Sequence, residues 1–230
     1  MSQQESSFAS KRLTFRAIRH PEDLAVFNAI NADEKGYQNS NYSNIKLPTQ
    51  ANAEKFMKET ADESLLGAII WLKPEFQETA DSPQKPAAPV QNSEEEILHP
   101  TWGTAIGEIH LSALPPAHAH HRWTDIGIDI LPAYQGRGYG GEAIEWALRY
   151  AFVQAGLHRV RIRAFAWNEG AVRLYKRLGF KDEGREREAV WFMGRWWDAV
   201  TLGILEDEWR ARERERSGYN NLVDVLVIDG

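Results

Sequence analysis

The chain has 230 residues, of which 43% are hydrophobic, and carries a net charge of −6 at neutral pH. This length favours a single domain with a sizeable core, and the acidic charge argues against a nucleic-acid partner, which needs a basic face. The chain contains no cysteine, which excludes disulfides and thiolate metal sites, and no run approaches the roughly 20 apolar residues of a membrane span. We therefore expect a cytoplasmic protein with no membrane partner.

The first third of the chain predicts a strand at 13–18, because apolar and polar residues alternate there, and then a helix at 21–32 that begins at a proline. Residues 33–48 are rich in Asn, Ser and Tyr, which favours a loop. Thr49 is placed to cap a second helix, and the apolar run at 65–72 predicts a buried strand.

The composition changes sharply after this strand. Residues 74–100 hold five prolines, six acidic residues and one lysine, so we predict a flexible insertion at 73–101. Two β-rich segments follow at 102–114 and 123–131. We treat residues 1–216 as one domain. The tail at 217–230 is expected either to fray or to add a strand to its own sheet or to that of a second copy, as in a homodimer.

The second half shows a clear alternation of helices and strands. Helical spacing predicts a helix from Gly138 to a stop at Gly156, and alternation predicts a strand at 160–166. Asn168 and Gly179 bracket the next helix as N-cap and C′ residues. Two strands at 180–193 and 195–205 and a charged helix at 206–216 complete an α/β (α+β) fold. We expect a mixed, mostly antiparallel sheet of six or seven strands flanked by about four helices.

A glycine-rich turn lies between a strand and a helix in the segment IDILPAYQGRGYGG, residues 128–141. Glycines permit close approach of a ligand, and a helix N-terminus offers unpaired N–H groups to a pyrophosphate. The candidate cofactor-binding residues of this segment are Ile128, Asp129, Ile130, Gln135, Gly136, Arg137, Gly138, Tyr139, Gly140 and Gly141.

Gly136, Gly138 and Gly141 also fit the dinucleotide pattern G-x-G-x-x-G, so a nicotinamide or flavin cofactor is an alternative. However, residues 132–135 separate the strand from the glycines, and no acidic residue follows at 158–167. The sequence contains no P-loop pattern. A tight turn without a ligand is the remaining structural alternative.

Two sequence blocks carry a family resemblance. The pattern Q-x-x-G-x-G at Gln135–Gly140 resembles the acyl-CoA pyrophosphate loop of the GNAT superfamily of N-acetyltransferases. Residues 168–180, NEGAVRLYKRLGF, resemble the helix that follows in that superfamily, of form N-x-x-A-x-x-L-Y-x-x-x-G-F. The pattern is most similar to the spermidine/spermine and ribosomal-protein N-terminal acetyltransferases.

The resemblance implies that acetyl-CoA is the co-substrate. It also implies that the backbone around Ile128 and Ile130 pairs with the pantetheine arm, that Asn168 reaches the same arm, and that Tyr175 contacts the cofactor and protonates the departing thiolate. A phenol, with an ordinary pKa of about 10, holds its proton at neutral pH. A core position is the structural alternative for Tyr175.

The general base remains open among Glu34, Glu108, His110 and Asp125, of which we favour Glu108 and Asp125. A surface salt bridge is the ordinary explanation for any one of these carboxylates, and a water relay would need none of them. No metal site is expected, because the histidines at 118, 120 and 121 lack carboxylate companions at ligand spacing.

These features predict an acetyl-CoA-dependent N-acetyltransferase that transfers the acetyl group directly to a primary amine in a ternary complex. The acceptor is a polyamine, another small amine or a peptide N-terminus. The alternatives from other classes are a non-catalytic acetyl-CoA sensor or interaction module and a nicotinamide-binding protein.

Overall fold

The computed structural model describes residues 6–77, 98–99 and 102–217. Within them the chain forms two compact units. The N-terminal unit comprises residues 8–113 and 127–147, and the C-terminal unit comprises residues 114–126 and 148–217 together with residues 6 and 7. Strand β5, Trp123–Ile130, contributes its first half to the C-terminal unit and its second half to the N-terminal unit.

The sheet of the N-terminal unit is antiparallel over β1, β2 and β4, which span Leu13–Ala17, Ser64–Leu72 and Gly103–Ser112. The short strand β3, Leu98–His99, pairs with the start of β4. The second half of β5 follows β4, and its end is fixed by a hydrogen bond from Leu131 N to Ile106 O of 2.8 Å. The strands predicted at the start and before the insertion are confirmed.

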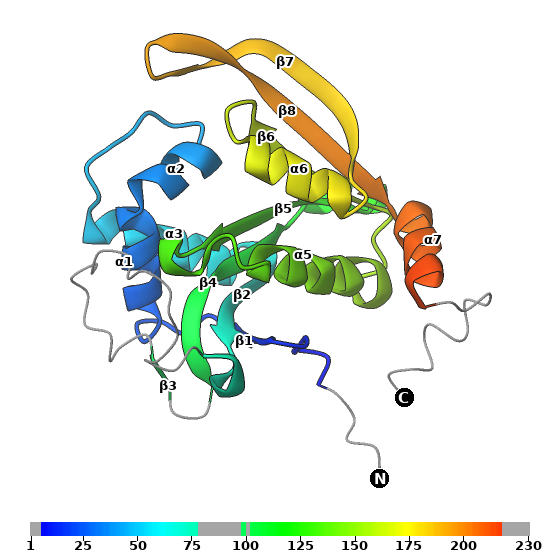
Figure 1. Ribbon diagram of the computed structural model, residues 1–230, viewed down its shortest axis with the longest axis horizontal. Coiled ribbons are helices and arrows are strands. Elements are labelled where there is room, and N and C mark those ends of the chain that lie inside the picture. Colours follow the sequence, from blue (N-terminus) through cyan, green and yellow to red (C-terminus); the bar gives the residue numbers. More distant parts are fainter. Residues whose placement is uncertain (1–5, 78–97, 100–101, 218–230) are drawn as a thin grey trace. The chain divides into compact units, whose positions relative to one another are not determined.

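Helices α1, Leu24–Ala32, and α3, Gln50–Asp62, pack against each other, and α3 also packs against β2 (Figure 1). Their inner faces bury Phe27 and Met57 completely, next to Ile69 of β2. Thr49 Oγ1 accepts a hydrogen bond from Asn52 N at 3.2 Å, so the predicted cap of α3 is confirmed.

The loop predicted at 33–48 is wrong in its first half, where helix α2 spans Glu34–Ser40. The helix starts directly after α1, with Tyr37 N donating to Asp33 O at 2.8 Å. Pairs four residues apart support it, since Gln38 donates to Glu34 and the Ser40 hydroxyl donates to Gly36 O. No residue of α2 is buried, so the hydrophobic pattern from which helices are predicted is missing here.

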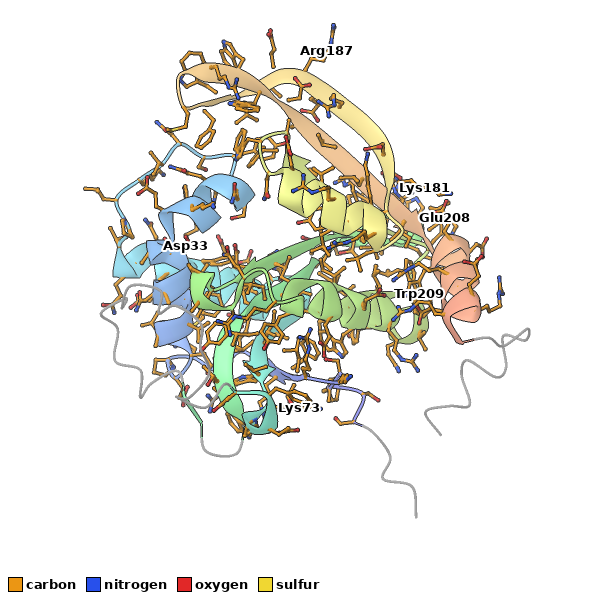
Figure 2. The ribbon with its side chains drawn as sticks, in the orientation of Figure 1. Asp33, Lys73, Lys181, Arg187, Glu208 and Trp209 are labelled. Atoms are coloured by element: carbon orange, nitrogen blue, oxygen red, sulfur yellow. The ribbon has the colours of Figure 1, made fainter. Side chains whose placement is uncertain are left out.

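The sheet of the C-terminal unit begins with Trp123–Asp125 of β5, which pair in parallel with β6, Arg159–Phe165. Strand β8, Arg195–Leu205, pairs antiparallel with β6 and with the edge strand β7, Lys181–Phe192. Figure 1 shows β7 and β8 as a long ribbon that leads into α7, Glu206–Ser217. Lys181 and Glu208, labelled in Figure 2, join β7 to α7 by an ion pair of 2.6 Å.

The helix predicted from Gly138 to Gly156 has two parts. Helix α5 spans Tyr139–Arg149 and continues into a π-helical turn at Tyr150–Gln154, closed by a hydrogen bond from Ala155 N to Tyr150 O of 2.9 Å. The wider turn carries Phe152, which is buried against Trp209 with ring centroids 5.4 Å apart. This tertiary packing is not visible in the local sequence.

Helix α6, Glu169–Arg177, is bracketed as predicted, because Asn168 Oδ1 caps it by accepting from Ala171 N at 3.3 Å and Gly179 follows with a φ of 93°. Most of the predicted insertion at 73–101 and the tail beyond 217 lie outside the described residues. Within the described part of the chain, no helix combines the length and apolarity needed to cross a membrane.

Candidate active site

The glycine loop is held at both ends by hydrogen bonds within the N-terminal unit. A 3-10 turn at Pro132–Tyr134 follows β5, and the side-chain amide of Gln135 donates back to Ile130 O at 2.7 Å. The side chain of Gln135 therefore closes the turn, and Gln135 and its neighbours Gly136, Arg137 and Gly138 are all exposed.

The backbone of the loop has the properties that a pyrophosphate requires. Gly136 and Gly138 have φ angles of 75° and 84°, a region that disfavours side chains, and a Cβ at Gly136 would meet no atom within 4 Å. Helix α5 makes its first backbone bond from Glu142 N to Gly138 O, so the N–H groups of Tyr139, Gly140 and Gly141 precede its ladder. An open turn with backbone N–H groups ahead of the helical ladder fits the diphosphate of acetyl-CoA.

The remaining candidates of this segment lie in β5 or at the start of α5. Ile128, Asp129 and Ile130 belong to the second half of β5, whereas the parallel register with β6 covers only Trp123–Asp125. The Tyr139 ring is buried beneath the Arg12 guanidinium, 4.4 Å from the ring centroid, so only its backbone N–H is placed to serve a ligand.

Asn168 and Tyr175 lie on α6 in the C-terminal unit. Because Asn168 Oδ1 caps the helix, its amide NH₂ is the part suited to donate to a ligand. Tyr175 is 9% exposed, and its ring centroid lies 6.2 Å from that of Phe180. Its side chain is thus packed within the unit, while the phenol has limited access to solvent.

Glu108 and His110 form a hydrogen-bonded pair on β4. Glu108 is 0% exposed, and its Oε2 lies 3.0 Å from His110 Nδ1. Glu108 Oε1 is buried with no hydrogen-bond partner among the described residues. Since a carboxylate accepts hydrogen bonds, it favours the His110 tautomer protonated on Nδ1, which leaves Nε2 as a proton acceptor.

The His110 ring is held in place from two sides. A Cβ built on Gly127 of β5 would lie 2.3 Å from His110 Cε1 and 2.5 Å from Nε2, so the ring lies directly over this glycine. The Phe56 ring meets the imidazole edge-on, with centroids 6.4 Å apart. Only a residue without a side chain at 127 permits this position of the ring.

Asp129 carries a perturbed carboxyl group next to this pair. Burial raises the pKa of Asp129 most, and the nearby Glu108 and Asp33 raise it as well, whereas His110 and a hydrogen bond with Ser40 lower it. The net result is a pKa of about 7. The side chain lies deep among other groups, although part of its surface remains accessible. Figure 2 labels Asp33 near the junction of α1 and α2. A carboxyl group that titrates near neutral pH is suited to proton transfer.

The other two candidate bases are engaged elsewhere. Asp125 receives two hydrogen bonds from Arg161, from Nε at 2.5 Å and Nη2 at 2.7 Å, and this pairing raises the pKa of Arg161. Glu34 is exposed on α2 and accepts from Gln38. The structure therefore brings together His110, Glu108 and Asp129. The grouping of Asp129 with the other two was not predicted, because it depends on the register of β4 against β5.

The profile of the acetyltransferase (GNAT) domain matches residues 12–181. The chain belongs to the GNAT acetyltransferase family. It is therefore an acetyl-CoA-dependent N-acetyltransferase, as the glycine loop and the α6 motif predicted. The family assignment thus favours acetyl-CoA over the nicotinamide cofactor.

Curated relatives support this membership. The chain is 24% identical over 202 residues to an uncharacterized N-acetyltransferase, YokL, of a Bacillus subtilis prophage, covering 87% of this chain and 94% of the relative. It is 34% identical over 92 residues to the spermidine N(1)-acetyltransferase of Vibrio cholerae, covering 40% of this chain and 53% of that protein.

Solved structures share the fold at low sequence identity. A GNAT-family acetyltransferase from Bacillus anthracis has a TM-score of 0.64 at 18% identity, over 87% of this chain and 98% of the other. Spermidine N-acetyltransferase from Vibrio cholerae, solved with CoA and spermine, has a TM-score of 0.63 at 21% identity, over 87% of this chain and 99% of the other. The predicted mixed-sheet fold is thereby confirmed.

Proposed function

We propose that this acetyltransferase acts on a primary amine that carries positive charge, with a polyamine as the favoured acceptor. The observation that carries the proposal is the effect of two carboxyl groups of the N-terminal unit, those of Glu108 and Asp33, on Asp129, whose pKa both raise. A bound ammonium group would relieve the repulsion between them. The spermidine acetyltransferases among the relatives agree with this choice.

His110 Nε2 is the proposed acceptor of the amine proton. The buried carboxylate of Glu108 orients the imidazole through Nδ1 and stabilises the imidazolium that forms. In this scheme Glu108 acts through His110 and does not contact the acceptor, so its role changes from candidate base to positioning residue. Asp129, in its ionised form, attracts the ammonium group of the incoming amine.

The remaining roles follow the family motifs. Acetyl-CoA supplies an activated acetyl thioester, and transfer is direct within a ternary complex. The N–H groups at the start of α5 hold the diphosphate, the backbone of Ile128 and Ile130 holds the pantetheine arm, and the Asn168 amide donates to the same arm. The Tyr175 hydroxyl donates a proton to the CoA sulfur as the thioester bond breaks.

The test is release of free CoA thiol from acetyl-CoA across a panel of acceptors. Spermidine, a neutral-chain monoamine, an acidic amino acid and a peptide with a free N-terminus separate the acceptor classes. We expect the highest kcat/KM with spermidine and the lowest with the acidic amino acid. Preference for the peptide would overturn the polyamine assignment, and binding of acetyl-CoA without release by any amine would favour a non-catalytic sensor.

A further inference from the structure

Arg12 connects the segment before β1 to the glycine loop of the same unit. Its Nη1 donates to Arg137 O at 3.0 Å, and its Nε donates to Glu142 Oε2 at 2.7 Å. Its backbone N–H donates to Glu142 Oε1 at 2.7 Å. One residue therefore holds both the exposed turn of the loop and the first turn of α5.

The partner carboxylate is fully engaged. Glu142 Oε1 also accepts from the Ser10 hydroxyl at 2.7 Å, and Lys73 Nζ donates to Ser10 O at 2.7 Å, which fixes the segment that carries Ser10. Burial alone would raise the pKa of Glu142, but hydrogen bonds from the Arg12 backbone, the Ser10 hydroxyl and the Arg12 guanidinium outweigh it and lower the pKa. Glu142 is thus held as an anion.

An anion at this position has opposite effects on the helix and on a phosphate ligand. A carboxylate in the first turn of α5 stabilises the helix through its dipole. The same charge repels a diphosphate bound at the helix N-terminus. The Arg12 guanidinium neutralises the charge of Glu142 by direct contact and also binds the Arg137 carbonyl. The side chain of Arg12 is 28% exposed and that of Glu142 is 16% exposed.

We propose that Arg12 is a positioning residue for acetyl-CoA, which shapes the diphosphate-binding loop and neutralises Glu142 beside it. The proposal rests on the assignment of this loop as the diphosphate site. It predicts that loss of Arg12 weakens ligands that carry the diphosphate, because the loop loosens and Glu142 repels them. Ligands without phosphate should not respond.

The test measures equilibrium binding by calorimetry for wild type, Arg12→Ala, Glu142→Gln and the double variant, with acetyl-CoA and with acetyl-pantetheine, which has no phosphate. We expect Arg12→Ala to raise the Kd for acetyl-CoA about tenfold, in line with the loss of one charge-assisted contact, and to leave acetyl-pantetheine unchanged. The double variant should recover part of this loss, since the uncompensated carboxylate is gone. Arg12→Lys keeps the positive charge but cannot contact the Arg137 carbonyl and Glu142 at the same time. Its Kd for acetyl-CoA should therefore lie between those of wild type and Arg12→Ala.

Lys55→Ala is the matched control, because it breaks an exposed ion pair with Glu59 of 3.5 Å in the same unit. It should bind both ligands like wild type. Unchanged acetyl-CoA affinity in Arg12→Ala, an equal loss for acetyl-pantetheine, or a double variant no better than the single one would each overturn the proposal. If wild type itself fails to bind acetyl-CoA, the loop assignment falls as well.

Discussion

The glycine loop and the His110 pair are both parts of the N-terminal unit, but they are built in different ways. The loop uses backbone groups of consecutive residues, and its shape follows from glycines at 136 and 138. In the His110 pair, the imidazole ring of His110 is positioned by Glu108 of β4, Gly127 of β5 and Phe56 of α3, which are three different elements. The loop is a local structure, whereas the pair depends on tertiary packing.

Because of this difference, we expect the loop to determine acetyl-CoA affinity and the His110 pair to determine the rate of proton transfer. A backbone site tolerates changes in surrounding side chains, so variants of the His110 pair should alter turnover with little effect on acetyl-CoA affinity. Variants of the loop and of its Arg12 contact should alter affinity first. Variants of each region show whether acetyl-CoA binding and turnover can be changed independently.

Tyr175→Phe is expected to have the largest effect of the variants outside the His110 pair. Removal of the hydroxyl leaves no donor for the departing thiolate, so turnover should fall about 100-fold, within the range of general acid catalysis. The Kd for acetyl-CoA should change little, because the ring remains packed. Steady-state kinetics together with calorimetry check this, and a wild-type turnover would remove Tyr175 from the mechanism.

Glu108→Gln should lower turnover about tenfold, because the neutral amide cannot stabilise the imidazolium of His110. Asp125→Asn is the matched control on the carboxylate that Arg161 engages. In the folded protein this control should retain wild-type turnover. If Asp125→Asn lost more activity than Glu108→Gln, the base would have to be sought at Asp125.

Gly127→Ala should reduce turnover about fivefold, since the new methyl group displaces the His110 ring from its position over residue 127. Gly184→Ala in β7 is the control, because a Cβ there meets no atom within 4 Å. Both variants should bind acetyl-CoA with similar affinity. A normal turnover in Gly127→Ala would show that the ring position is unimportant for the reaction.

We expect Asp129→Asn to keep the fold and to change how the free energy of unfolding depends on pH. The folded pKa of about 7 lies above the ordinary value of about 3.9, so the native state holds a proton that the unfolded chain releases. This stabilising contribution is fully present below about pH 4 and is lost as the pH rises through 7. Between pH 4 and pH 8, the free energy of unfolding of the variant should rise relative to that of wild type by about 1–2 kcal/mol, after allowance for solvent screening.

Urea unfolding of wild type and Asp129→Asn at the two pH values measures this gain. Glu108, His110, Asp33 and Ser40 act on the Asp129 carboxyl group, so the comparison keeps all of them unchanged. A stability difference independent of pH would mean that the Asp129 carboxyl group titrates at its ordinary pKa.

Most of the fold could be predicted because its signals are local. The caps at Thr49 and Asn168 and the glycine at 179 mark helix ends directly in the sequence. Helix α2 is not predicted because it buries no residue. The π-helical turn at 150–154 carries Phe152, which packs against Trp209, a contact that the local sequence does not show.

The candidate site divides in the same way into local features and features that depend on tertiary structure. The glycine loop was predicted from consecutive residues, whereas the salt bridge between Asp125 and Arg161 and the approach of Asp129 to Glu108 depend on strand register. Arg12 lies 130 residues from Glu142 in the sequence, and neither residue belongs to a motif. Nothing local marks their contact.

The role of His110 as acceptor of the amine proton is tested by the turnover of His110→Ala at saturating acetyl-CoA and amine, with and without added imidazole. We expect turnover to fall about 100-fold with unchanged acetyl-CoA affinity, and to recover in part when imidazole supplies the missing base. Wild-type turnover in the variant would contradict the assignment of His110 as the acceptor of the amine proton.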